Sequence, residues 1–177
     1  MFSVPVVSVL KEVLLNSASE LPTGLPPIID SGIETLILGS FPSPASLAAG
    51  QYYAHRQNQF WRLMAALTGE PLHDLEYALR CRRVLAHGLG IWDVYRSCRR
   101  QGALDASIRE SESNDFGCLK KEAPRLRRVV FNGKTAGLLI RRFSAAGYAT
   151  TVVPSSSPAY TLTFERKLAL WRAALLD

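Results

Sequence analysis

A short turn after an apolar run is the first place in this sequence where chemistry is expected. The run 35–38 is followed by five turn residues, Gly39, Ser40, Phe41, Pro42 and Ser43. Glycine lets a ligand approach the backbone closely, and the amides of Ser40 and Phe41 are candidates to donate to an acceptor oxygen. The structural alternative is that Ser43 caps a short helix at Pro44. The pattern G-x-x-x-x-G-K-[ST] is absent, which excludes a phosphate-binding loop of that kind.

The loop behind this turn carries aromatic and hydrogen-bonding side chains. Tyr53 is either a core aromatic or a platform on which a planar base can stack. His55 is a candidate general base or a solvated histidine. Asn58 stands where the N-cap of the next helix is expected, but its carboxamide also combines a donor and an acceptor. Orienting a water molecule requires that combination, so both interpretations of Asn58 stay open.

Polar groups also follow three other apolar runs. Asp93 ends the run 90–92, so it either caps the next turn or accepts hydrogen bonds from the N–H edge of a ligand. Lys134 is the one lysine beside such an end. Arg96, Arg99 and Arg100 follow Asp93 and are candidates to line a binding side. The run 150–153 leads into a serine-rich segment that is either an ordinary turn or a phosphate-binding helix start, Ser155, Ser156, Ser157 and Pro158.

The four apolar runs predict strands at 35–38, 90–94, 128–131 and 150–153. Helical spacing predicts helices at 60–67, 74–87 with Asp74 as N-cap, 114–124, 135–146 and a last one carrying Phe164 and Trp171. Strands that alternate with helices predict a three-layer α/β/α fold around a central four-stranded parallel sheet. Ligands of such sheets bind beyond the carboxyl ends of the strands, where the groups described above gather.

The first thirty residues are expected to be an N-terminal extension, and residues 31–177 a single α/β domain. Apolar spacing predicts a short helix over 6–14, and Pro22, Pro26 and Pro27 then predict an extended connection. The sequence has no secretory cleavage pattern at its start and no apolar run of the length that a membrane span requires. A cytoplasmic protein is therefore expected.

Charge and cysteine content narrow the function classes. A net charge of +6 and a pI of about 9.5, mostly from arginine, favour a polyanionic partner such as nucleic acid. The three cysteines, Cys81, Cys98 and Cys118, have no C-x-x-C spacing, which argues against a disulfide framework, a zinc site and an iron–sulfur cluster.

Taken in order, several blocks resemble the uracil-DNA glycosylase superfamily, most closely its branch of DNA-deoxyinosine (hypoxanthine-DNA) glycosylases. The resemblance extends from residue 24 to residue 171, and the first thirty residues lie mostly outside it. The blocks that carry it are 36–43, 46–47, 50–55, 58–61, 91–94, 104–105, 114–116, 131–133 and 155–159.

The resemblance implies roles for single residues. The superfamily usually has Asp or Asn two positions after the first-motif glycine to activate or orient water, but Phe41 stands there. The resemblance implies that this role moves to Asn58, as in the deoxyinosine branch. Tyr53 matches the aromatic that stacks on the extruded base, and Asp93 falls near the Asn with which uracil-specific members read the base edge. Arg56 replaces a proline common in the branch, which puts the stiffness of this loop in doubt.

The resemblance therefore implies a monofunctional DNA glycosylase of base excision repair that flips and hydrolytically removes deaminated bases. Hypoxanthine is the expected base, with uracil and xanthine as further candidates. Gly39, Ser40 and Phe41 are expected to hold the base with Tyr53 and Asp93. DNA contacts are expected from Pro42, Ser43, Lys134, Ser155, Ser156, Ser157 and Pro158.

The implied enzyme is a monomer that needs no metal or cofactor and has no membrane partner. Its partner is single- or double-stranded DNA containing a deaminated base. Lys134 keeps a Schiff-base lyase step open, although this step is not favoured. Two alternatives of other classes remain: a non-catalytic nucleic-acid or nucleotide-binding α/β module, which Phe41 would fit, and a free nucleoside N-glycosidase.

Overall fold

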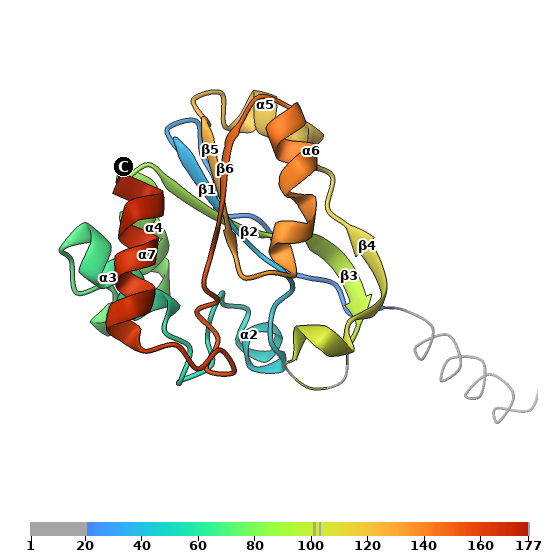
Figure 1. The fold of residues 1–177 in the computed structure, drawn as a ribbon, viewed down its shortest axis with the longest axis horizontal. Helices are drawn as coiled ribbons and strands as arrows, with labels where there is room; N and C mark the ends of the chain where they lie inside the picture. Colours follow the sequence, from blue (N-terminus) through green and yellow to red (C-terminus); the bar gives the residue numbers. More distant parts are fainter. Residues whose placement is uncertain (1–20, 101, 103, 177) are drawn as a thin grey trace, which may run out of the picture.

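The computed structural model describes residues 21–100, 102 and 104–176. Its centre is a four-stranded sheet with the strand order β2-β1-β5-β6, in which every neighbouring pair is parallel (Figure 1). The strands are β1 (Thr35–Gly39), β2 (Leu89–Asp93), β5 (Arg128–Asn132) and β6 (Ala149–Val153). The four predicted strands and their parallel arrangement are confirmed.

Helices cover both faces of this sheet (Figure 1). On one face lie α3 (Phe60–Thr68), α4 (Tyr77–Ala86) and α7 (Phe164–Leu176), and on the other lie α5 (Leu119–Glu122) and α6 (Ile140–Ala145). The predicted three-layer α/β/α arrangement is confirmed. No helix in the described ranges has the length and apolar character that would let it cross a bilayer.

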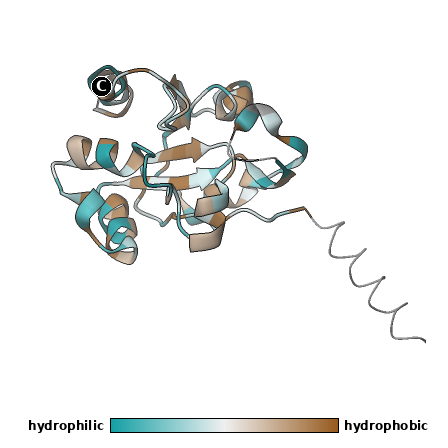
Figure 2. Ribbon diagram, turned by 90° about the horizontal axis from the view of Figure 1, so that it is seen from below, coloured by the Kyte–Doolittle hydropathy of each residue, from teal (hydrophilic) through white to brown (hydrophobic). Residues whose placement is uncertain are grey.

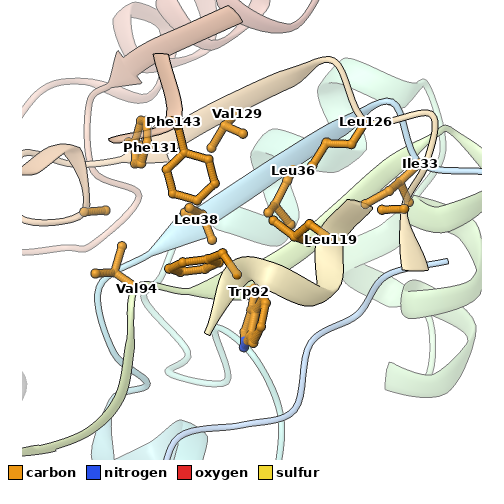
Figure 3. Close-up of a cluster of buried hydrophobic side chains, with 13 residues drawn as sticks. Ile33, Leu36, Leu38, Trp92, Val94, Leu119, Leu126, Val129, Phe131 and Phe143 are labelled. Atoms are coloured by element: carbon orange, nitrogen blue, oxygen red, sulfur yellow. The ribbon is translucent and has the colours of Figure 1, made fainter. Parts of the chain in front are cut away.

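Successive strand residues point to opposite faces, and this alternation builds two cores. Leu36 and Leu38 lie with Trp92 and Phe143 on the α5–α6 side (Figure 3). Ile37 lies with buried residues of α3 and α7 on the other side. Strands that are apolar on both faces need helices on both faces, and Figure 2 shows the mainly brown sheet between helices with teal segments.

Three predicted helices differ from the observed ones at their starts. Asp74 does not cap α4, because it belongs to the 3₁₀ turn η1 (Leu72–Asp74) and α4 follows only at Tyr77. The predicted helix 114–124 is the turn η3 (Phe116–Cys118) followed by one α-helical turn, α5. The predicted helix 135–146 likewise opens as 3₁₀, in η4 (Ala136–Leu139).

The sequence patterns missed an antiparallel hairpin of β3 (Tyr95–Arg99) and β4 (Arg109–Ser113). The segment between its strands includes the turn η2 (Asp105–Ser107). A short helix, α2 (Pro44–Ala49), follows the first turn, and Ser43 caps it by accepting from the amide of Ser46. The structural alternative for Ser43 is therefore confirmed.

Residues 21–30 run along the edge of the sheet. Ile28 pairs with Ile91 in both directions, and the amide of Gly24 donates to the carbonyl of Arg96 at 2.7 Å. This segment covers the exposed edge of β2, where an open strand would invite pairing with another chain. The predicted helix over 6–14 lies outside the described residues.

Candidate active site

A cavity of about 380 Å³ opens at the carboxyl ends of the parallel strands. Its lining comes from the turn after β1, the loop before α3, the end of β2, the turn after β5 and the loop after β6. All thirteen residues proposed from the sequence line it: Gly39, Ser40, Phe41, Pro42, Ser43, Tyr53, Asn58, Asp93, Lys134, Ser155, Ser156, Ser157 and Pro158. The parallel topology therefore gathers residues that lie more than a hundred positions apart in the chain.

Gly39 and Asp93 are neighbours across β1 and β2. They are paired in register, and a Cβ atom at residue 39 would collide with Asp93 Oδ1 and lie 3.0 Å from the Tyr53 hydroxyl. The absence of a side chain at Gly39 is therefore required by the carboxyl group beside it. The backbone carbonyl of Asp93 is also fixed, because Asn114 Nδ2 donates to it at 2.8 Å.

The Asp93 side chain is 3% exposed, and its Oδ2 has no hydrogen-bond partner in the described part of the chain. Asp93 therefore does not cap the next turn through this oxygen. Burial raises the pKa of Asp93 to about 8, the negative charge of Asp105 adds to the rise, and the positive charge of Arg100 opposes it. These surroundings favour the protonated form of the carboxyl group.

The turn after β1 is held from behind by the segment that follows β3. The Arg100 side chain is only 5% exposed, and its guanidinium donates to the carbonyls of Phe41, at 3.2 Å, and Pro42. Ser40 Oγ donates to Asp105 Oδ1 at 2.7 Å. The Phe41 ring is buried, and in the described ranges no hydrogen bond is made by the Ser40 or Phe41 amides.

Tyr53 has one ring face against the core. Its ring stacks on Phe60 with 3.8 Å between centroids and 17° between planes. The backbone of Tyr53 has φ +56, a left-handed conformation that is uncommon for a residue with a side chain. Burial raises the pKa of Tyr53, and its hydroxyl accepts from Asn132 Nδ2 at 3.2 Å. Tyr53 can be both a core aromatic and a stacking platform, because Phe60 covers only one face of its ring.

Asn58 stands at the start of α3. Its Oδ1 accepts from the Phe60 amide at 3.0 Å, although the residue at the N-cap position is Gln59. Asn58 therefore makes the hydrogen bond expected of an N-cap side chain, although it lies one residue before the N-cap position. An amide oxygen has two lone pairs, so Oδ1 keeps one acceptor site, and Nδ2 has no hydrogen-bond partner within the described ranges.

The serine-rich segment is a loop held by buried groups, and α7 begins only at Phe164. Of the two interpretations of this segment, the ordinary turn is therefore confirmed, and the helix start is wrong. Ser156 is 1% exposed, and its amide and hydroxyl bond to the Asn132 carboxamide at 2.8 and 2.9 Å. Lys167 is fully buried in α7 and its Nζ donates to the Ser157 carbonyl at 3.2 Å. Ser155 and Ser157 remain partly exposed.

The three arginines after Asp93 have different environments. Arg100 lines the cavity, whereas Arg96 and Arg99 lie on the exposed side of β3 and pair with Glu112 and Glu110. Exposure along β3 does not alternate strictly, because Ser97 and Cys98 are both buried between the two exposed arginines and the pairing with β4 shifts register there. In the described ranges, no group of three or more His, Cys, Asp and Glu side chains is arranged to hold a metal ion.

Three residues at the site were missed as functional candidates: Asn132, Asp105 and Lys167. Asn132 follows an apolar strand directly, as Asp93 does, and this position was a signal that could have found it. Arg100 was proposed together with Arg96 and Arg99, and no pattern distinguished it from those two, while Lys167 has the spacing of an ordinary helix residue. Their burial depends on tertiary packing.

Comparisons with known proteins find a family model, two relatives and a solved structure that are similar to this chain. A family model described as the uracil DNA glycosylase superfamily matches residues 26–176. A hypoxanthine DNA glycosylase of Methanosarcina barkeri strain Fusaro is 39% identical over 151 residues, which cover 85% of this chain and 96% of the relative. One of Methanosarcina acetivorans is 39% identical over 150 residues, which are 85% and 95% of the two chains.

A solved structure is also similar to this chain. It is the solution NMR structure of a candidate uracil DNA glycosylase from Methanosarcina acetivorans, with a TM-score of 0.80 and 38% sequence identity. The match covers 87% of this chain and 96% of that one.

Proposed function

This chain belongs to the uracil-DNA glycosylase superfamily, and we propose that it is a monofunctional DNA glycosylase that removes hypoxanthine from DNA by hydrolysis. Uracil and xanthine, which arise by the same kind of deamination, are further candidate substrates. The similarity to two hypoxanthine DNA glycosylases supports the choice of base. In this proposal the protein is a cytoplasmic monomer that works on the chromosome without a metal or cofactor.

The observation that carries the proposal is the convergence of three different groups on one cavity. Tyr53 offers an aromatic face, Asp93 a buried carboxyl, and Asn58 a carboxamide with a free acceptor site. A base that leaves the duplex needs a stacking surface and a partner for its hydrogen-bonding edge, and hydrolysis needs a positioned water molecule. The cavity supplies a candidate for each requirement.

In the proposed reaction, the damaged nucleotide is rotated out of the helix and its base stacks on Tyr53. The amides of Ser40 and Phe41 donate to the base. As the glycosyl bond breaks, negative charge moves onto the base, and fixed donors of this kind contribute about 3–4 kcal/mol each. Asn58 holds a water molecule near the anomeric carbon, where the sugar develops positive charge.

The DNA backbone is proposed to lie across the rim of the cavity. Ser155, Ser157 and Pro158 come from the loop after β6, Pro42 and Ser43 from the turn after β1, and Lys134 from the turn after β5. Ser156 keeps this loop in place from below, because its polar groups are already bonded to Asn132. The net charge of +6 favours association with the polyanion at low salt.

Single-turnover excision assays with the full chain test this proposal. Labelled oligonucleotides would carry one hypoxanthine, uracil or xanthine, and alkali would cleave at any abasic site. Alkali-dependent cleavage at hypoxanthine is the expected result. Cleavage without alkali would instead indicate a lyase step, and Lys134→Met would then test that lysine.

The alternative functions give different results in the same assays. Tight binding without cleavage of any of the three substrates would indicate a non-catalytic module and overturn the proposal. Hydrolysis of free inosine, with little dependence on salt, would indicate a nucleoside N-glycosidase. A matched undamaged oligonucleotide controls for contaminating nuclease.

A further inference from the structure

Asp93 differs from every other residue that lines the cavity. Among those lining residues, all within the described ranges, it alone has a buried side-chain oxygen without a hydrogen-bond partner. Its position is fixed by the sheet register and by the absence of a side chain at Gly39. A buried polar group without a partner carries a free-energy cost, and such groups are retained where a ligand completes them. The carboxyl group is therefore placed to meet a ligand.

The protonation state of Asp93 decides what that ligand can be. An ionised carboxylate only accepts hydrogen bonds, whereas a protonated one donates one and accepts another. The surroundings favour protonation: the group is desolvated, and Asp105 places a second negative charge nearby. Arg100, the cation that opposes this effect, is already engaged by the carbonyls of Phe41 and Pro42.

Building on the proposed function, we propose that Asp93 reads the extruded base as a neutral carboxylic acid. It donates one hydrogen bond to a ring carbonyl and accepts another from the adjacent ring N–H. The corresponding substrate class is bases with neighbouring N–H and C=O groups, which hypoxanthine, uracil and xanthine share. An ionised Asp93 would accept from the N–H but repel the carbonyl oxygen.

This proposal predicts a loss of excision at alkaline pH. With the pKa of Asp93 near 8, the reactive fraction is full below that value and falls about tenfold per pH unit above it. The other titratable groups that face Asp93 are Tyr52, Tyr53 and Cys98, and burial raises the pKa of all three above their ordinary values. His55 and Lys134 also line the cavity.

The decisive variant is Asp93→Asn. Asparagine has the same shape, offers one donor and one acceptor, and does not ionise. Single-turnover excision of hypoxanthine from an oligonucleotide would be measured from pH 5.5 to pH 10 for both proteins. We expect the variant to retain most of the rate at neutral pH and to lose the alkaline fall. Ionisation of the base itself affects both proteins equally, so the ratio of their rates isolates Asp93.

Two further variants separate Asp93 from its neighbours. Asp105→Asn removes the charge that helps to raise the pKa of Asp93, so the alkaline fall should move to lower pH whatever happens to the maximal rate. His55→Gln changes an exposed ring in the loop before α3 and should leave the pH of the alkaline fall unchanged. A shift with His55→Gln would overturn the assignment to Asp93.

The unfolding free energy gives a second readout that needs no activity. The folded protein keeps a proton on Asp93 that the unfolded chain releases at lower pH, so the contribution of Asp93 to wild-type stability falls as pH rises between about 4 and 8. Asp93→Asn lacks this contribution. Its gain in melting temperature over wild type should therefore grow across that interval.

The outcomes distinguish this inference from the proposed function. A wild-type protein without excision at any pH on any of the three bases would refute the proposed function itself. An active wild type whose alkaline fall is matched by Asp93→Asn would refute only the neutral-acid role of Asp93. A folded Asp93→Asn protein that is inactive throughout would also refute it, because the neutral isostere should substitute.

Discussion

The two ends of the central sheet both have a cavity, and the larger one lies away from the proposed chemistry. The cavity at the amino end measures about 560 Å³, against about 380 Å³ at the carboxyl end. Glu34 and Arg125 line the amino-end cavity, and they pair with each other at 2.8 Å. The charged groups of that end are therefore largely satisfied among themselves. Size alone does not identify a binding site in this fold.

Two carboxyl groups show the difference most clearly. Glu34, just before β1, has its pKa lowered by hydrogen bonds and charge from Arg127 and Arg125. Asp93, at the end of β2, has its pKa raised by burial. One group is stabilised as a charged partner at the surface, and the other is forced towards its neutral form inside a cavity. A carboxyl pKa that is raised by burial in a cavity marks a candidate functional group. Substitutions at the carboxyl end of the sheet are therefore expected to impair excision more than substitutions at the amino end.

Replacing Asn58 should have the largest effect. Asn58→Ala removes the proposed water-positioning amide, and we expect single-turnover excision of hypoxanthine to fall by about 100-fold or more. The same change removes the acceptor for the Phe60 amide, which costs about 1 kcal/mol of stability. Thermal melts beside the excision assay would separate these two effects.

Asn58→Ser is the matched control for that experiment. Serine is a good acceptor at a helix start but is too short to take the place of the carboxamide, so stability should return while excision stays low. Full excision by either variant would remove Asn58 from the mechanism. The strongest argument for placing the reaction at the carboxyl end of the sheet, rather than at the amino end, would then fail.

Replacing Tyr53 should have the next largest effect. Tyr53→Ala removes the aromatic face proposed for stacking, which is worth about 1–3 kcal/mol per base, or about 5- to 150-fold in binding or rate. Tyr53→Phe keeps the ring and its stack on Phe60, and it removes only the hydroxyl that accepts from Asn132. We expect Phe to retain most of the excision rate. Equal losses in both variants would show that the hydroxyl, rather than the ring face, matters.

Replacing Arg100 should have a smaller effect on excision, because this residue acts through the turn that it holds. Arg100→Met leaves the carbonyls of Phe41 and Pro42 without their donor, and we expect excision to fall by about tenfold because the turn amides shift. Removing this cation should also raise the pKa of Asp93 further and move the alkaline fall to higher pH.

The matched control for Arg100 is Arg96→Met, on the exposed side of β3, the strand that precedes Arg100. In the described ranges the Arg96 side chain pairs only with the exposed Glu112, so neither the rate at saturating DNA nor the pH profile should change. An unchanged pH profile in Arg100→Met would show that the arginine acts on the turn alone.

The sheet could be predicted from sequence because its four strands are short runs bounded by turn residues. β1, β2 and β5 have the apolar pattern of strands buried on both faces, whereas β6 is mostly exposed. The hairpin could not be predicted. β4 (Arg109–Ser113) is exposed along its whole length, and β3 mixes exposed arginines with a buried serine and cysteine, so neither strand has an apolar pattern. Their pairing depends on contacts between segments that a local pattern does not show.

Most cavity residues were found for a similar reason, since they end or closely follow a predicted parallel strand. Tyr53 and Asn58 instead lie in the loop before α3, and the family resemblance implied their roles. The groups that hold them were not found. Lys167 occupies an ordinary helix position, and its burial under the serine loop follows only from the way α7 packs on the sheet. The raised pKa of Asp93 likewise comes first from its burial and then from the charge of Asp105, which belongs to a segment with no predicted structure.

The smallest effect is expected at the amino end. Glu34→Gln weakens the ion pairs with Arg125 and Arg127, whose side chains are 66% and 75% exposed, and exposed pairs of this kind contribute little. We expect no measurable change in excision at any pH and only a small fall in melting temperature, largest at low salt. If Glu34→Gln impaired excision as strongly as Arg100→Met, the larger cavity would have a part in the reaction. The distinction between the two ends would then fail, because paired surface charges would matter as much as the buried groups around Asp93.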